Sequence, residues 1–211
     1  MSQAAVPDSN EFTELPIEYR DEHESIKITG FWMFLVTDML IFGSLFATYA
    51  VYHNRTAGGP SGQTLFQMGP VFAETLLLLT SSFTVGMAIY YLRRANRRAT
   101  AAWLVATMAL GAGFVALELN DFFTYAASGA GWHVSAFLSS FYLLVATHGF
   151  HVTFGILWAT TLLFQLLKRG PADPKVARKL FTFSLYWHFL DIVWVFIFSY
   201  VYLAGHLGHM L

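Results

Sequence analysis

The chain contains no cysteine, which excludes disulfides, thiolate metal sites, iron–sulfur clusters and cysteine nucleophiles. Charged residues are also scarce. They make up 12% of the 211 residues, and soluble domains carry about 25%. The net charge of −1 gives no basic surface for a nucleic-acid partner. Hydrophobic residues, by contrast, reach 56% and aromatic residues 18%, so the composition indicates a membrane protein.

The N-terminal segment, residues 1–27, lacks the positive start and short apolar core of a cleaved signal peptide. It is rich in Asp and Glu and carries only Arg20 and Lys27 as basic residues. We interpret it as an acidic, partly disordered cytosolic tail. Residues 28–211 then form the membrane domain.

Five apolar stretches are each long enough to cross a bilayer, which takes about 20 residues at ~1.5 Å of helix rise per residue. Backbone groups inside lipid must pair within their own segment, so these stretches are predicted to be helices. The sequence therefore predicts an all-α integral membrane protein. The predicted spans are 28–52, 70–92, 99–123, 134–167 and 180–204.

Basic residues decide the orientation of these spans. All but one of the 12 lysines and arginines lie in the tail or in the connections around 93–98 and 168–179. The exception, Arg55, follows the first span. Because positive loops stay in the cytoplasm, we expect a cytoplasmic N-terminus and a periplasmic C-terminus.

Several ionisable residues fall inside the spans, where a charge costs about 2.5–3.5 kcal/mol and needs protein, water or another polar group beside it. From the helix rise, one set lies near the middle of the bilayer and another toward the outer ends of the second and third spans. The middle set is Asp38, His148, His151, His188 and Asp191, and the outer set is Glu74, Glu118 and Asp121.

Two pairs in the middle set have i,i+3 spacing, which places both members on one side of a helix. They are His148 with His151, and His188 with Asp191. One interpretation is a metal site, because these side chains ligate zinc, copper and iron. The other is a polar cluster that joins the fourth and fifth spans by hydrogen bonds, with Asp38 or water as a further partner. We favour the cluster, since the Glu-x-x-His pairs of a di-iron bundle are absent.

Aromatic and small residues in the spans are interpreted as structural. Tryptophans such as Trp187 and Trp194 are expected mostly to face lipid or the membrane interface. Glycines such as Gly111, Gly149 and Gly155 are expected to let helices approach closely.

Three segments resemble subunit III of haem-copper terminal oxidases: residues 30–38 (GFWMFLVTD), 147–152 (THGFHV) and 186–194 (YWHFLDIVW). They occur in the family's order, and the resemblance covers about residues 26–205. Residues 46–51 (FATYAV) and 72–75 (FAET) resemble the bacterial cytochrome bo-type ubiquinol oxidase subunit III in particular.

The resemblance implies a non-catalytic core subunit of a proton-pumping ubiquinol:oxygen oxidoreductase in the bacterial inner membrane. The chain itself would bind no cofactor, with haems and copper in subunit I. Its helices would form two groups, the first two spans against the last three, around a cleft that holds phospholipid. Partners would be subunit I and other oxidase subunits including II and IV, with ubiquinol a substrate of the complex.

The resemblance also assigns residues. Asp38 matches the family's intramembrane carboxylate and Asp121 a second family acid, while the middle-set histidines and Asp191 match signature positions that are not metal ligands. Glu118 stands where mitochondrial relatives have an amide. The alternatives are subunit III of a cytochrome c oxidase, a stand-alone haem or metal protein of the membrane, and a small ion transporter.

Overall fold

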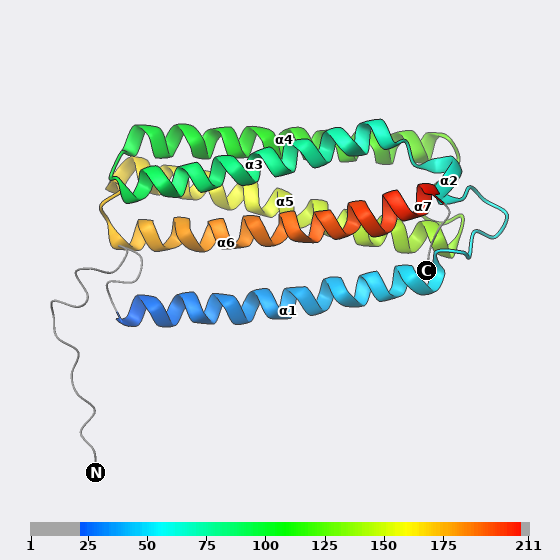
Figure 1. Ribbon diagram of the computed structural model, residues 1–211, viewed down its shortest axis with the longest axis horizontal. Helices are drawn as coiled ribbons and strands as arrows, with labels where there is room; N and C mark the ends of the chain where they lie inside the picture. The colour runs from blue at the N-terminus through cyan, green and yellow to red at the C-terminus, as the bar shows by residue number, and fades with distance from the viewer. Residues whose placement is uncertain (1–21, 208–211) are drawn as a thin grey trace, which may run out of the picture.

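Residues 22–207 are described by the structure, a computed structural model. The predicted tail therefore lies outside the described residues over 1–21. Five long helices run side by side along the molecule (Figure 1). Their bounds are α1 Glu22–Tyr52, α3 Met68–Arg93, α4 Arg97–Ala127, α5 Ala136–Arg169 and α6 Pro174–Phe196.

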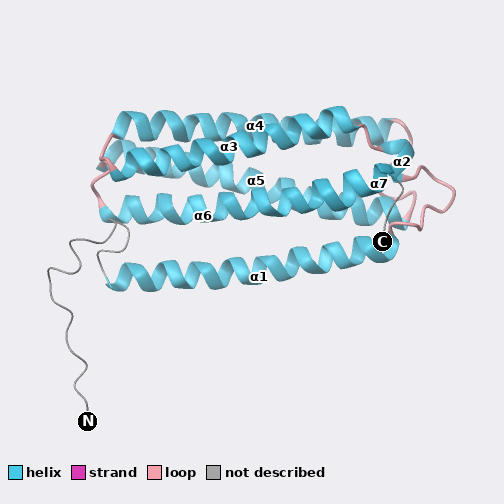
Figure 2. Cartoon of the chain, in the orientation of Figure 1, coloured by secondary structure: helices cyan, strands magenta, loops and turns pink. Residues whose placement is uncertain are grey.

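Three short elements complete the chain. The helix α2, Gly62–Leu65, lies in the connection after α1. The last long helix continues from α6 through a π-helical segment, Ile197–Leu203, into α7, Ala204–Leu207. The described residues contain helices and loops without a strand (Figure 2).

The five predicted spans are confirmed. Helices long and apolar enough to cross a membrane cover Ile28–Tyr52, Met68–Arg93, Arg97–Ala127, Ala136–Arg169 and Pro174–Leu207. The largest difference is at the last span, which begins at Pro174 rather than 180. The reason is local: Asp173 caps this helix by accepting the backbone N–H of Lys175 at 2.9 Å, and proline is well suited to a first helical position.

The turns between α3 and α4 and between α5 and α6 lie at one end of the bundle, which we call the basic end (Figure 1). Arg94 and Arg169 lie beside these two turns. The loops 53–61 and 128–135, with α2 and α7, lie at the other end, which we call the loop end.

The helices group differently from the predicted arrangement. α3 packs mainly along α4 and α6, whereas α1 packs mainly against α5 and α6. The first two spans therefore do not form a pair; α1 lies beside a bundle of four helices (Figure 1). The buried side chains of α1 are spaced three, four or seven residues apart, so they lie on one side of the helix. They are Ile28, Leu35, Asp38, Phe42 and Tyr49.

Candidate functional site

Half-way along the bundle, an acid–imidazole contact joins α1 to α5. His151 Nε2 lies 3.2 Å from Asp38 Oδ1. The other ring nitrogen, Nδ1, lies 2.6 Å from the carbonyl oxygen of Thr147, to which it donates. Because Nδ1 carries the proton of that bond, the contact at Nε2 needs a further proton, on the imidazole or on the carboxyl group. The pair is thus a hydrogen-bonded link between two helices.

His148 lies one turn away but is bound elsewhere. Its side chain is completely buried, and Nε2 lies 3.2 Å from the carbonyl oxygen of Leu190 on α6. The rings of Phe42, Phe114 and Trp194 surround the imidazole, with centroids 6.4, 5.6 and 5.2 Å away. The i,i+3 spacing therefore does not build one site from His148 and His151. Each imidazole connects α5 to a different helix.

The second predicted pair has a partner that the spacing could not reveal. Ser82 Oγ on α3 lies 2.7 Å from His188 Nδ1. Asp191 Oδ2 is 3.9 Å from the same nitrogen, which is an electrostatic contact beyond hydrogen-bond reach. The predicted side shared by His188 and Asp191 is confirmed.

The expectation that tryptophans mostly face lipid or the interface is wrong for Trp187 and Trp194, which are buried, whereas Trp32 and Trp132 are exposed. Trp187 donates Nε1–H to Ser81 Oγ at 2.9 Å, and Trp194 donates to Thr75 Oγ1 at 3.0 Å. Both bonds join α6 to α3. The Trp187 ring fits because Gly111 on α4 and Gly155 on α5 face it, and a Cβ at either glycine would lie within 2.9 Å of the ring. The predicted close approach at glycine is confirmed there.

The outer acids form a cluster nearer the loop end. Glu74 on α3 and Glu118 and Asp121 on α4 are all buried and interact electrostatically with one another. Both oxygens of Glu74, one of Glu118 and one of Asp121 have no hydrogen-bond partner among the described residues. Because these oxygens meet no donor on another helix, they do not join helices by hydrogen bonds as the middle pairs do.

Glu118 is held against the backbone of α5. A Cβ built on Gly149 would overlap the Glu118 carboxylate. The glycine between the two histidines of residues 147–152 therefore makes room for an acid from the neighbouring helix.

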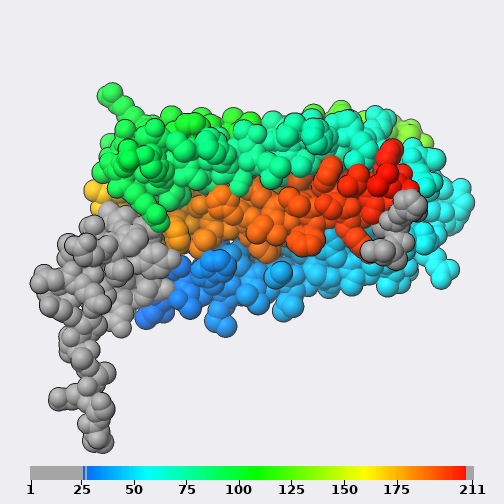
Figure 3. All heavy atoms as spheres, viewed as in Figure 1, coloured from blue at the N-terminus to red at the C-terminus, as the bar shows by residue number. Residues whose placement is uncertain are grey.

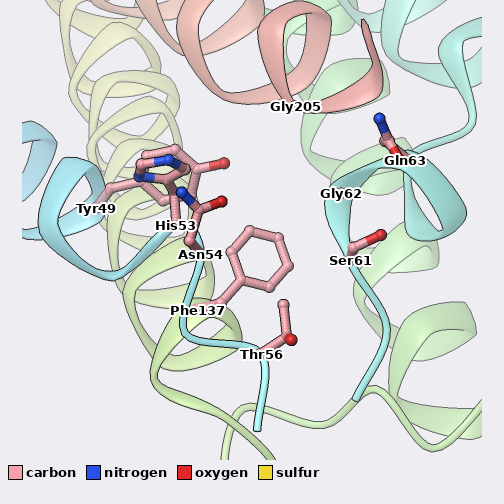
Figure 4. A pocket seen from close by; sticks show the side chains of 9 residues that line it. All are labelled: Tyr49, His53, Asn54, Thr56, Ser61, Gly62, Gln63, Phe137 and Gly205. Carbon is pink, nitrogen blue, oxygen red and sulfur yellow. The ribbon is translucent and has the colours of Figure 1, made fainter. Parts of the chain in front are cut away.

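A polar cavity of about 360 Å³ opens at the loop end (Figure 4). His53 and Asn54 line it where α1 ends, and Ser61 and Gln63 lie opposite on the segment that carries α2. No Asp, Glu, Lys or Arg lines it. None of the predicted site residues is among its lining residues.

Within residues 22–207, no group of three or more His, Asp or Glu side chains is placed to hold a metal ion. The predicted middle set instead forms three separate contacts, and each joins α6 or α5 to another helix.

Comparison with known proteins gives consistent relatives. The family described as cytochrome c oxidase subunit III matches residues 22–206. Quinol oxidase subunit 3 of Bacillus subtilis (strain 168) is 49% identical over 190 residues, 90% of this chain and 93% of the relative. Cytochrome c oxidase subunit 3 of Bacillus sp. (strain PS3) is 49% identical over 86% of this chain and 87% of its own length. Cytochrome bo(3) ubiquinol oxidase subunit 3 of Pseudomonas putida is 45% identical over 87% of this chain and 89% of its own length.

Proposed function

The chain belongs to the cytochrome c oxidase subunit III family, and we propose that it is the non-catalytic subunit III of a proton-pumping ubiquinol:oxygen oxidoreductase. The observation that carries this proposal is the match to proteins named quinol oxidase subunit 3 over nine tenths of the chain. The structure supports it chemically, since the buried imidazole of His148 and the Asp38–His151 pair are engaged in contacts between helices.

The complex would lie in the bacterial inner membrane as part of the aerobic respiratory chain. We place the N-terminus in the cytoplasm and the C-terminus in the periplasm. The basic end supports this orientation, because both of its turns are flanked by Arg and Lys, whereas Arg55 is the basic residue found at the loop end within residues 22–207.

In the complex, subunit I would hold the haems and the copper, and this chain would pack beside it together with subunits II and IV. Its contribution would be to keep subunit I in its active geometry and to supply, through Asp38, a negative field near the route of proton uptake. Ubiquinol would bind to the complex and not to this chain.

The proposed phospholipid site is the groove between α1 and α5. A cavity of about 560 Å³ there is lined by Phe31, Phe34, Leu157, Trp158 and Tyr186, among others, and its surface is almost entirely apolar. Such a lining suits an acyl chain. The groove lies where α1 packs along α5 and α6.

The test is purification of the tagged chain from membranes in mild detergent. We expect a larger haem-bearing subunit to co-purify, ubiquinol to support oxygen consumption, and the chain separated from its partners to show no reduced-minus-oxidised haem spectrum. Oxygen consumption with reduced cytochrome c but not with ubiquinol would assign a cytochrome c oxidase instead. Stoichiometric haem or metal on the separated chain, or ion flux through it alone in liposomes, would contradict the proposal.

A further inference from the structure

One face of the bundle presents polar side chains to its surroundings at half depth. Figure 3 views this face, on which α6 (orange) lies between α3 (teal) and α1 (blue). A groove of about 400 Å³ lies on the α3 side of α6, and another of about 200 Å³ on the α1 side. His188 and Ile192 line both grooves.

The depth of these side chains is set by the helices that carry them. Asp191 lies at the middle of the span Pro174–Leu207, and Ser82 is close to the middle of Met68–Arg93. Outside the chain they are therefore surrounded by lipid hydrocarbon or by another membrane protein. Lipid hydrocarbon contains no water to pair with them.

The polar groups at this depth are incompletely satisfied. The His188 side chain is 43% exposed. Its hydrogen bond within the described residues is the one between Nδ1 and the Ser82 hydroxyl, which leaves Nε2 available. Neither carboxylate oxygen of Asp191 meets hydrogen-bond geometry there. Polar groups left unpaired in an apolar medium cost free energy, and an acyl chain offers them neither donor nor acceptor.

The other middle-set imidazoles differ in this respect. His148 is fully buried, and the His151 side chain is 19% exposed with Asp38 beside it. Their own bundle covers them. His188 needs cover from outside the chain.

The rim of this face is apolar. Trp32 and Met39 on α1, Leu79 on α3 and Ile192 on α6 are all exposed around the polar centre. Small grooves with an apolar rim and one polar centre suit the packing of another helix. The apolar rim would supply van der Waals contact, and a hydrogen bond at the centre would fix the position of that helix along the bundle.

We propose that this face is a docking surface for a transmembrane helix of a neighbouring oxidase subunit. That helix carries a hydrogen-bonding side chain near its middle, such as an amide, a hydroxyl or a cation, which reaches the exposed His188 imidazole at Nε2. The proposal rests on the proposed function, since it requires a complex with neighbours.

Photo-cross-linking in the whole complex tests this surface. A benzophenone amino acid replaces Ile192 in one variant. In the control it replaces Phe150, which lies at the same depth on α5, is 70% exposed and lines neither groove. Irradiation at Ile192 should give an adduct with a transmembrane peptide of another oxidase subunit that has a polar side chain near its middle, at several times the yield from Phe150. An Ile192 adduct with lipid alone, in a complex whose subunits still co-purify, overturns the proposal.

A second measurement probes the hydrogen bond. His188→Gln keeps a donor and an acceptor, whereas His188→Leu removes both. In complexes that are not irradiated, we expect the neighbouring subunit to dissociate in detergent about threefold more readily from the leucine variant, the usual effect of one interhelical hydrogen bond. Dissociation from the glutamine variant should stay near that of the wild type. Equal release by both variants contradicts the polar contact. If no oxidase subunit co-purifies with the wild-type chain, the proposed function itself is wrong.

Discussion

The middle and the outer part of this membrane bundle handle ionisable side chains in opposite ways. In the middle, Asp38 faces His151 at 3.2 Å and His188 faces Ser82 at 2.7 Å, each across a helix boundary. Nearer the loop end, Glu74, Glu118 and Asp121 are buried together, with oxygens that find no partner among the described residues. The first set, apart from Asp191, joins helices to each other, whereas the oxygens of the second set named here make no hydrogen bond within the described bundle.

The difference shows that burial depth does not determine the role of an intramembrane acid. What matters is whether a donor from another helix faces it. Asp38 has such a donor and Glu74 does not, so substitutions should separate the two sets.

The largest effect is expected from His151→Leu, because it leaves Asp38 buried without its partner. Breaking a buried pair in this way should lower the free energy of unfolding by about 3 kcal/mol. SDS titration of the purified chain in mixed micelles measures it. The double variant Asp38→Leu with His151→Leu should lose less than the single variant. Strict additivity of the two substitutions would show that the residues do not interact.

Gly149→Ala should follow, since the new methyl group overlaps the Glu118 carboxylate. Overpacking of this kind should cost about 2 kcal/mol in the same titration. The control is Gly86→Ala, where a Cβ meets nothing within 4 Å, and a helix-interior alanine should stabilise by about 0.5–1 kcal/mol. In a Glu118→Ala background the Gly149→Ala cost should largely disappear; a cost that persists would place the clash elsewhere.

His148→Phe keeps an aromatic ring in the buried site but removes the bond to the Leu190 carbonyl. We expect a loss of about 1 kcal/mol, the usual net contribution of a hydrogen bond. Bound haem and copper in the complex should stay the same as in the wild type. Loss of haem in a complex that still assembles would show that the imidazole does more than join α5 to α6.

The smallest effects are expected from Glu74→Gln and Asp121→Asn in the purified chain. Neither change removes a helix-to-helix hydrogen bond found in the described bundle. The free energy of unfolding should therefore change by no more than about 0.5 kcal/mol. A loss similar to that of His151→Leu would abolish the contrast between the two sets.

The sequence predicted the spans well because a bilayer sets their length and apolar character. It also predicted the depth of Asp38 and His151, since helix rise converts residue number into depth. It named Asp38 as a candidate partner of the histidine cluster but could not specify His151, because helices apolar on every side give no directional pattern to identify neighbours. The grouping of α1 with α5 and α6 was missed for that reason.

Trp187 shows the same limit. An indole in a membrane span suits the interface and a glycine-lined pocket equally, and Gly111 and Gly155 lie on two other helices. Only their arrangement in space reveals the pocket. The hydroxyl partners Ser81, Ser82 and Thr75 were equally hidden, since small residues signal close packing without indicating which side chain they meet.

Oxygen consumption by the Asp38→Asn complex, followed over many catalytic cycles with ubiquinol, tests the central claim most directly. If Asp38 both supports proton uptake and helps to stabilise the redox subunit beside this chain, the haem content should match the wild type and the initial rate should be lower. Activity should then decay faster, together with loss of bound phospholipid. An initial rate, a decay and a lipid content all equal to those of the wild type would contradict the role given to Asp38.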